Sequence, residues 1–381
     1  MTGRLPEAWV DDVLSRVRLV DLIGRDVALV RKGREHVGRC PFHQEKTPSF
    51  TVNEGKGFYH CFGCSAHGGA VAYLMARGRA TFREAMEDLA ARVGVPMPEG
   101  EPRHGVRPLP PVARPSAEEL AREDERSIER ARALWRDDTR DPRGTPVEAY
   151  LRHRGLGAWV DDRIPPTLRF ARLTYWAARK GAERPVDLGK WPVMVAGMQA
   201  ADGRVRAVHL TYLAPDGRGK AEVVDPETGE VLPAKKMRGA PWGCAIRLAP
   251  AAEAMGFGEG IETSGSVQIA AGLPCWAAGS LGNLAGAGKG RGRRHPTRVL
   301  DDGRPMLLPS ALPDMDRPGI ILPVLPLVST ATLLEDADSD PHVMAALMER
   351  ASRRYAAEGR RVERARPPEG FDFNDLMRGA A

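Results

Sequence analysis

Four residues near the N-terminus have the types and spacing of a metal site. Cys40 and His43 form a C-x2-H pair, and Cys61 and Cys64 form a C-x2-C pair after seventeen intervening residues. Thiolate and imidazole ligands in two such pairs can meet around a tetrahedral zinc ion, which uses all four positions when its role is structural. The sequence therefore predicts a structural zinc site formed by Cys40, His43, Cys61 and Cys64.

Two other uses of these cysteines are a redox C-x-x-C motif and a disulfide. A redox motif should lie near a βαβ pattern, whereas Cys61 follows a short aromatic, strand-like run and has a second pair of ligand types upstream. His60 and His67 lie close enough in sequence to compete as ligands, but neither forms a two-residue-spaced pair with Cys40. Zinc bound through His43 remains the favoured interpretation.

A second group of chemically capable residues is acidic and lies in the C-terminal third. Glu259 follows the apolar run 254–258, and Asp336, Asp338 and Asp340 follow another apolar run that ends at Glu335. Carboxylates gathered at strand ends repel one another unless a hard cation neutralises them, and magnesium or manganese prefers such oxygen ligands. The pattern is typical of phosphoryl transfer.

The D-x-D-x-D run has two other interpretations. A calcium loop of the EF-hand type needs Gly at its sixth position and Glu at its twelfth, where this chain has Pro341 and Leu347. That interpretation fails. The interpretation of the run as a solvated cap for the helix that follows remains possible, because acidic residues favour helix starts. Asp340 and Glu262 are each as well explained by a capping or supporting role as by a direct role in the site.

Basic residues gather in a glycine-rich stretch between the acidic runs, GAGKGRGRRHPTR. They are Lys289, Arg291, Arg293, Arg294 and Arg298. Glycines with cations could form a mobile loop that neutralises phosphates, and the alternative is a disordered, solvated loop. The stretch is not a nucleotide-binding P-loop, because the required G-x4-G-K-[ST] spacing is missed.

The elements that must position these residues fall into four segments. In residues 1–95, the sequence predicts a helix near 6–15, short strands around the cysteine pairs, and a helix that begins with a capping box at Thr81 and Glu84. Seven prolines between Pro96 and Pro115 predict a semi-extended linker. A charged helix follows, so residues 96–140 form the second segment.

The third segment, residues 141–250, reads as β-rich. VMVAGMQ and VRAVHLTYL alternate like paired antiparallel strands around a turn at residues 201–203. Residues 251–381 then alternate strands with helices, including a helix at 341–357, which predicts a mostly parallel sheet with its site at the carboxyl ends of the strands. The glycine-rich first strand, 254–258, should pack weakly, and an insertion at about 285–327 leaves the strand order open.

Two stretches resemble known families. CPFH, TPSF and YHCFGC with their flanks resemble the zinc-binding domain of bacterial-type (DnaG-like) DNA primases. EGIETSGSVQIAAGLPCWAAGSLGNL, LLEDADSDP and PPEGFDFND resemble the Toprim domain, most of all the primase-like version of phage, plasmid and integrated-element proteins. This second resemblance extends upstream to AYLRHRGL and AVHLTYLAPDGRGKA. Together, the two resemblances imply a zinc-ribbon-like N-terminal domain, a β-rich middle region and a C-terminal Toprim α/β sheet. The expected fold is therefore a multidomain fold of the α+β and α/β classes.

The resemblance also implies roles. Glu259 would orient or exchange protons with the reacting groups, while Asp336 and Asp338, with Asp340 as a further ligand, would hold magnesium or manganese. Lys220, Lys235, Lys236 and Arg238 would form part of a basic template groove, unless they are ordinary surface charge. The aromatic residues around the zinc pairs would either stack on single-stranded bases or pack the small zinc core; they are Phe42, Phe50, Phe58, Tyr59 and Phe62.

Length and composition fit this scheme. The 381 residues allow two or three domains, 42% are hydrophobic and 28% charged, and the net charge of +6 favours a polyanionic partner without proving one. Cys244 and Cys275 are interpreted as free thiols in the core of a protein from a reducing compartment. The N-terminus has no signal-peptide core, and the longest apolar run is short and broken by prolines. A cytoplasmic location is therefore expected.

The function expected from these features is a DNA primase that makes short RNA primers on single-stranded DNA from ribonucleoside triphosphates. No helicase motor motif is found, so a separate replicative helicase is the expected partner. Two alternatives are a Toprim-type nuclease and a non-catalytic, zinc-dependent DNA-binding accessory protein. A covalent strand-passing mechanism would need a positioned tyrosine, and none of the six tyrosines lies in a recognisable active-site string.

Overall fold

The structure is a computed structural model of the chain, and it describes residues 5–32, 35–42, 48–61, 66–78, 80–98, 117–177, 185–290, 292–299, 305–323, 325–336, 340–368 and 370–379. The chain divides into two compact units. The first contains residues 1–120, 178–185 and 296–307, and the second contains residues 121–177, 186–295 and 308–381. The four segments predicted from the sequence stay predictions.

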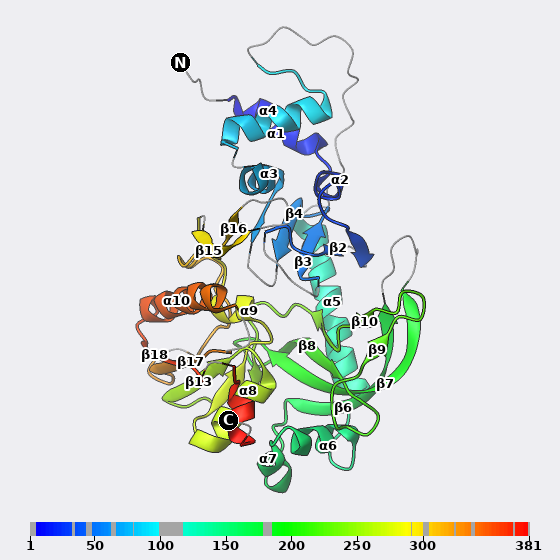
Figure 1. Cartoon of the computed structure of the whole chain (residues 1–381), viewed down its shortest axis with the longest axis vertical. Coiled ribbons are helices and arrows are strands. Elements are labelled where there is room, and N and C mark those ends of the chain that lie inside the picture. The colour runs from blue at the N-terminus through cyan, green and yellow to red at the C-terminus, as the bar shows by residue number, and fades with distance from the viewer. Residues whose placement is uncertain are drawn as a thin grey trace. The chain divides into compact units, whose positions relative to one another are not determined.

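The first unit contains a five-stranded antiparallel sheet with the order β1-β2-β3-β4-β5. Its helices are α1 (Glu7–Arg16), α2 (Leu19–Ile23), α3 (Ala70–Gly78) and α4 (Phe82–Val93), and its strands are β1 (Val30–Lys32), β2 (Glu35–Gly38), β3 (Phe50–Asn53), β4 (Phe58–Cys61) and β5 (His67–Gly68). Helix α1 packs along α4 (Figure 1). The capping box predicted at the start of α4 is confirmed, since the Thr81 side chain accepts from the Glu84 N–H and Glu84 accepts from the Thr81 N–H.

The middle of the chain forms a four-stranded antiparallel sheet with the order β11-β8-β7-β6. The elements here are α5 (Ala117–Asp137), α6 (Pro146–His153), α7 (Gly157–Asp161), β6 (Leu168–Ala177), β7 (Val186–Gln199), β8 (Val205–Tyr212), β9 (Val223–Val224), β10 (Val231–Leu232) and β11 (Lys235–Gly239). The predicted antiparallel pair is confirmed as β7 and β8. The apolar edge of α5, including Ala131 and Leu134, is buried with residues of this sheet.

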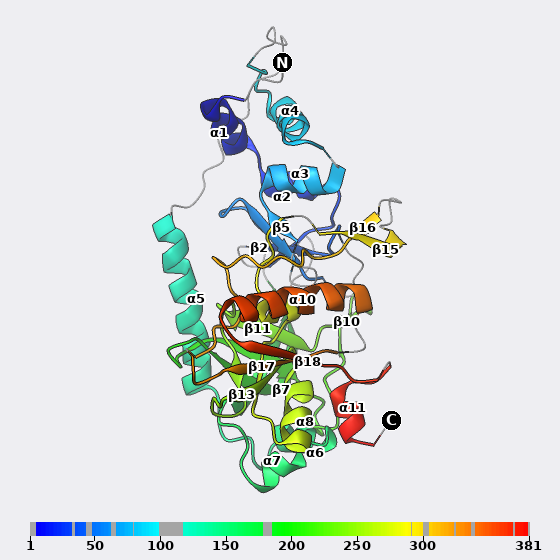
Figure 2. The same cartoon turned by 90° about the vertical axis from the view of Figure 1, so that its left-hand side faces the viewer.

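The C-terminal sheet is mostly parallel, with the order β12-β14-β13-β17-β18, and only β12 runs antiparallel to its neighbour. Its elements are β12 (Ile246–Arg247), β13 (Ala254–Gly258), α8 (Ile261–Ala271), β14 (Cys275–Ala277), α9 (Leu281–Ala285), β17 (Thr330–Leu334), α10 (Pro341–Ala357), β18 (Arg361–Ala365) and α11 (Phe373–Met377). Helix α10 covers one face, and α8 with α11 lies on the other (Figure 2). The predicted α/β sheet is confirmed.

The expectation that the glycine-rich strand β13 packs weakly is wrong. It is the central strand of the sheet, and its Met255 and Phe257 side chains are fully buried. A Cβ on Gly256 would lie 2.5 Å from Cys275 Sγ, and one on Gly258 would lie 2.6 Å from Ser264 Oγ. The glycines therefore let β14 and α8 approach the backbone of β13 closely.

The basic insertion is not a free loop where the structure describes it. Its short strands are β15 (Arg294–Val299) and β16 (Pro305–Leu307). The Lys289 N–H donates to Leu312 O, and the Asp314 N–H donates to Ala287 O. From α10, the buried Arg350 guanidinium donates to Ser310 O and Gly286 O at 2.6 and 2.9 Å. Arg350 thus holds the residues at Gly286 and Ser310 against α10.

Candidate functional site

The predicted zinc ligands belong to the antiparallel sheet of the first unit. Cys40 follows β2 and Cys61 ends β4, and both side chains are buried. Cys40 Sγ accepts the Phe42 N–H at 3.4 Å, and Ser49 Oγ lies 3.2 Å from Cys61 Sγ. The Phe42 N–H directed at Cys40 Sγ, and a hydroxyl within reach of Cys61 Sγ, suit the negative charge of metal-bound thiolates, so the donor set fits zinc. His43 and Cys64 lie outside the described residues.

The aromatic residues near these cysteines form the core of the zinc-binding unit. Phe42, Phe50 and Tyr59 are almost fully buried, and their ring centroids lie 5.1–6.0 Å from one another. Tyr73 packs against Phe42 and Tyr59. The packing interpretation is therefore confirmed for these three of the five predicted aromatics, because rings without exposed faces cannot stack on bases. Phe62 lies outside the described residues.

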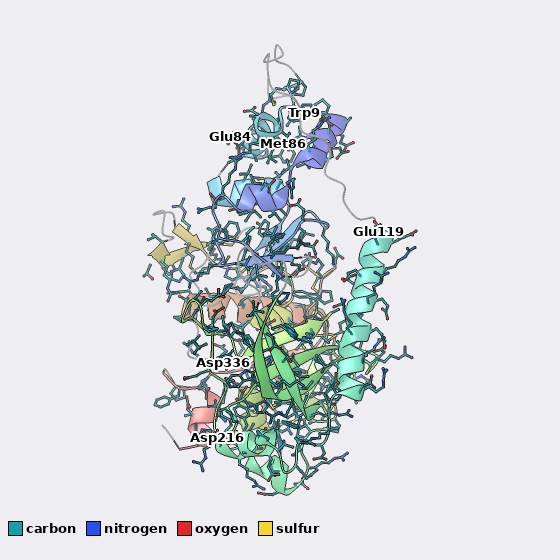
Figure 3. The ribbon with its side chains drawn as sticks, turned by 90° about the vertical axis from the view of Figure 1, so that its right-hand side faces the viewer. Trp9, Glu84, Met86, Glu119, Asp216 and Asp336 are labelled. Atoms are coloured by element: carbon teal, nitrogen blue, oxygen red, sulfur yellow. The ribbon has the colours of Figure 1, made fainter. Side chains whose placement is uncertain are left out.

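The acidic residues meet at the C-terminal sheet. Glu259 directly follows β13, and Asp336 lies two residues after β17. Because β13 and β17 pair in parallel, their carboxyl ends meet at one edge of the sheet. Both acids line a single cavity of about 320 Å³. Figure 3 marks Asp336 at this place.

Asp336 has a fixed orientation. The Thr263 hydroxyl, in the first turn of α8, donates a hydrogen bond to Asp336 Oδ1 at 2.9 Å. Asp338, the second predicted acid of this run, lies outside the described residues. Within the ranges that the structure describes, no three His, Cys, Asp or Glu side chains form a cluster that could hold a metal ion. The carboxylates of Glu259 and Asp336 are nevertheless hard oxygen donors that fit magnesium or manganese.

Asp340 is used as a helix cap. Its Oδ1 accepts the N–H groups of His342 and Val343 at 2.9 and 3.1 Å at the start of α10, and His295 Nε2 lies 3.2 Å from both of its oxygens. The His295 and His342 rings lie 5.0 Å apart, edge to face. Of the two roles that the sequence left open for Asp340, capping is the one that these contacts support.

Basic residues from the middle of the chain also line the cavity. Lys220 Nζ and Lys235 Nζ lie 3.6 and 3.7 Å from the two carboxylate oxygens of Glu262. The Tyr150 hydroxyl donates to Glu262 Oε1 at 2.5 Å. Arg154, the buried His209 and the acidic Asp372 belong to the lining as well.

Burial and neighbouring charges shift the pKa values of Glu262, Lys220 and His209. Burial would raise the pKa of Glu262, but the ammonium groups of Lys235 and Lys220 and the Tyr150 hydrogen bond outweigh it, so that pKa lies well below its usual range. Burial lowers the pKa of Lys220, while Glu262 opposes this effect. Burial and the charge of Lys235 lower the pKa of His209 to about 3, so its imidazole is neutral near pH 7.

The other predicted basic residues lie elsewhere. Lys236 Nζ donates to Trp176 O at 2.5 Å and lies 3.3 Å from the centroid of the Tyr175 ring. Side chains alternate along a strand, so Lys236 and Arg238 face away from the cavity that Lys235 lines. Of the insertion, Lys289, Arg293 and Arg294 do not line the described cavity. Arg291 lies outside the described residues.

Several residues in or next to the cavity were not predicted as site residues. Arg154, His209 and Thr263 line it, Tyr150 contacts it through Glu262, and Glu262 itself was left undecided. Contacts between segments far apart in sequence position them, such as that of Tyr150 with Glu262 and that of Asn374 with Arg154. The signal that could have found them was the resemblance itself, since AYLRHRGL contains Tyr150 and Arg154 and AVHLTYLAPDGRGKA contains His209.

The chain matches two family models, a CHC2 zinc finger over residues 5–104 and a domain of unknown function (DUF7146) over residues 125–248. It is 37% identical over 195 residues to a DNA primase of Pasteurella multocida (strain Pm70), covering 50% of this chain and 32% of the relative. It is 38% identical over 164 residues to the DNA primase of Escherichia coli (strain K12), and this match covers 43% of this chain and 27% of the relative. The chain thus spans about a third of the length of these curated relatives.

Among solved structures, the chain is similar to the zinc-binding and RNA polymerase domains of the Aquifex aeolicus primase, with a TM-score of 0.30 and 16% identity over 97% of this chain and 82% of that one. A DnaG primase catalytic domain bound to single-stranded DNA gives a TM-score of 0.38 and 12% identity, and the match covers 68% of this chain and 76% of that one. These scores are too low to establish a shared fold. The sequence matches show that the chain is similar to bacterial DNA primases over up to half of its length, and that residues 5–104 match the CHC2 zinc-finger model.

Proposed function

We propose that this chain is a DNA primase, a DNA-directed RNA polymerase that joins ribonucleotides into short primers on single-stranded DNA. The observation that carries the proposal is the cavity at the end of the C-terminal sheet. Glu259 and Asp336 line it, and so do Lys220 and Lys235. Carboxylates that hold a divalent cation, in the same cavity as ammonium groups that hold phosphate, are the parts that nucleotidyl transfer needs.

The roles of the residues follow from their chemistry. Glu259, Asp336 and Asp338 would hold magnesium or manganese, which supplies stabilisation of charge on the attacking and leaving oxygens in an in-line displacement. Glu259 also offers a carboxylate that can orient the reacting groups. Lys220 and Lys235 would bind the phosphates of the incoming ribonucleoside triphosphate, a narrower role than the template contact expected from the sequence. Thr263 keeps Asp336 oriented.

The zinc domain would help hold the template strand. The net charge of +6 favours a polyanionic partner such as single-stranded DNA. A separate replicative helicase would supply the unwound strand. Within the described residues, none of the helices is long and apolar enough to cross a membrane.

The test is an incubation of the protein with single-stranded DNA, ribonucleotides and magnesium or manganese, followed by separation of the products on a gel. We expect short oligoribonucleotides from the wild type, their loss in Asp336→Asn, and wild-type yields from Asp216→Asn. Asp216 is a matched control because it lies in an exposed turn, where its Oδ1 accepts the Arg218 N–H (Figure 3).

Two other results would contradict the proposal and identify its alternatives. Cleaved DNA without primers would indicate a Toprim-type nuclease. Binding of DNA with neither product would indicate a non-catalytic, zinc-dependent accessory protein.

A further inference from the structure

Two lysine side chains and one buried glutamate form a compact cluster in the lining of the cavity. Glu262 lies in the first turn of α8, Lys235 begins β11, and Lys220 lies in the connection between β8 and β9, where it forms an isolated bridge with Leu213. The Glu262 side chain is 8% exposed, while the two lysine side chains are 40% and 42% exposed. The glutamate is therefore the buried partner, and both lysines keep exposed surface while they contact it.

The carboxylate of Glu262 is itself held in place. Tyr150 lies on α6 and is 1% exposed, and its hydroxyl donates to Glu262 Oε1 at 2.5 Å. Each carboxylate oxygen contacts a different ammonium group, Oε1 that of Lys220 and Oε2 that of Lys235. One acid, fixed by one tyrosine, thus sets the separation of two cations.

We propose that Glu262, locked by Tyr150, is a positioning residue that presents Lys220 and Lys235 to a triphosphate in the cavity. This inference rests on the proposed function, since it names how the same site binds the phosphates of its nucleotide. An ammonium group has three donors, so a lysine that gives one to Glu262 keeps others for a phosphate oxygen. Phosphate binding then costs little rearrangement, because the cations are already in place.

Charge supports this arrangement. Two ammonium groups in one partly buried site repel each other and lose hydration, and either effect favours loss of a proton. Lys220 also faces Arg154, which adds to the repulsion, while the neighbouring His209 is neutral near pH 7. The acidic groups of the lining, Glu259, Asp336 and Asp372, are the remaining charges of the cavity. Glu262 is the carboxylate in direct contact with both lysines.

The test uses inorganic tripolyphosphate, titrated into the full chain by calorimetry with and without magnesium. The titration is repeated at a series of pH values between about pH 6 and pH 9, because burial lowers the pKa of Lys220. Glu262→Gln keeps the shape and removes the charge. Tyr150→Phe keeps every charge and removes the hydrogen bond. Glu349→Gln, on the exposed side of α10 where Glu349 pairs with Arg353, is the control.

We expect Glu262→Gln to bind tripolyphosphate about tenfold more weakly near pH 8 and to lose binding at a lower pH than the wild type, because Lys220 loses the carboxylate that opposes the lowering of its pKa. Tyr150→Phe should weaken binding in the same direction but less, and Glu349→Gln should match the wild type. A purely structural role for Glu262 would not move the pH profile.

Tighter binding by Glu262→Gln throughout the pH range would overturn the inference, since it would mean that the glutamate merely reduces the positive charge of the site. Wild-type binding and pH profile in both variants would overturn it as well. These results are independent of primer synthesis. If the wild type makes no primers but both variants bind tripolyphosphate less well, the positioning role stands and the primase proposal fails.

Discussion

At the scale of single residues, Asp336 and Asp340 show how one acidic run is divided between two tasks. Asp336 faces the cavity with Glu259, and its orientation depends on Thr263. Asp340, four residues later, accepts backbone N–H groups at the start of α10 and contacts His295. Acids that look alike in the sequence therefore separate by what they contact.

Thr263→Val tests the support of Asp336. Valine has nearly the same shape but cannot donate to the carboxylate, so we expect the affinity for Mn²⁺ to fall by about 10–100-fold, as is usual when a residue that orients a metal ligand is lost. Electron paramagnetic resonance of free Mn²⁺ measures this. Thr174→Val in strand β6 is the control, and equal affinities in the two variants would refute the role of Thr263.

Asp340→Ala tests the cap. Loss of a side-chain acceptor at a helix N-terminus costs about 1 kcal/mol of unfolding free energy, which urea unfolding followed by circular dichroism can detect. We expect Mn²⁺ binding to survive this change. A variant of unchanged stability that no longer binds Mn²⁺ would instead make Asp340 a ligand.

At the scale of elements, the central strand β13 depends on its glycines. Gly256→Ala would place a Cβ 2.5 Å from Cys275 Sγ in a packed core, so we expect a loss of about 1–3 kcal/mol of unfolding free energy. Gly219→Ala, where no atom lies within 4 Å of the new Cβ, should leave stability almost unchanged. Equal midpoints of thermal unfolding for the two variants would refute the close approach of β14.

Local patterns were sufficient to predict the hairpin of β7 and β8, the capping box of α4 and the parallel sheet with Glu259 and Asp336 at its edge, while the zinc ligands stay a prediction. They were not sufficient for contacts that depend on tertiary packing. The approach of β14 to Gly256, and the burial of Arg350 against carbonyls of the insertion, have no local signature. The cluster of Lys220, Lys235 and Glu262 joins a connection and a strand to a helix, and sequence spacing does not encode such a contact.

At the scale of the whole molecule, the chain has two units with separate chemistry. The zinc pairs belong to residues 1–120, and the acids and lysines of the cavity belong to the second unit. Each unit has its own buried apolar clusters. A defect in the zinc site should therefore leave the carboxylate site intact.

Cys61→Ser tests this independence. We expect the variant to lose its zinc, to lose folded structure in the first unit and to use template poorly, because small zinc domains depend on the metal for folding. Its affinity for Mn²⁺ should remain that of the wild type. Zinc content by atomic absorption and protease sensitivity of residues 5–98 report on the first unit, and a parallel loss of Mn²⁺ binding would show that the two units are coupled.

The proposed primase chemistry requires that Glu259 and Asp336, from separate strands, hold a divalent cation at one sheet edge. The most direct measurement is a Mn²⁺ titration of the wild type, Glu259→Gln, Asp336→Asn and the control Asp216→Asn, followed by electron paramagnetic resonance. We expect the wild type and Asp216→Asn to bind Mn²⁺ alike, and each of the other two variants to bind it much more weakly. Wild-type binding by Asp336→Asn and Glu259→Gln would contradict a metal site between these strands.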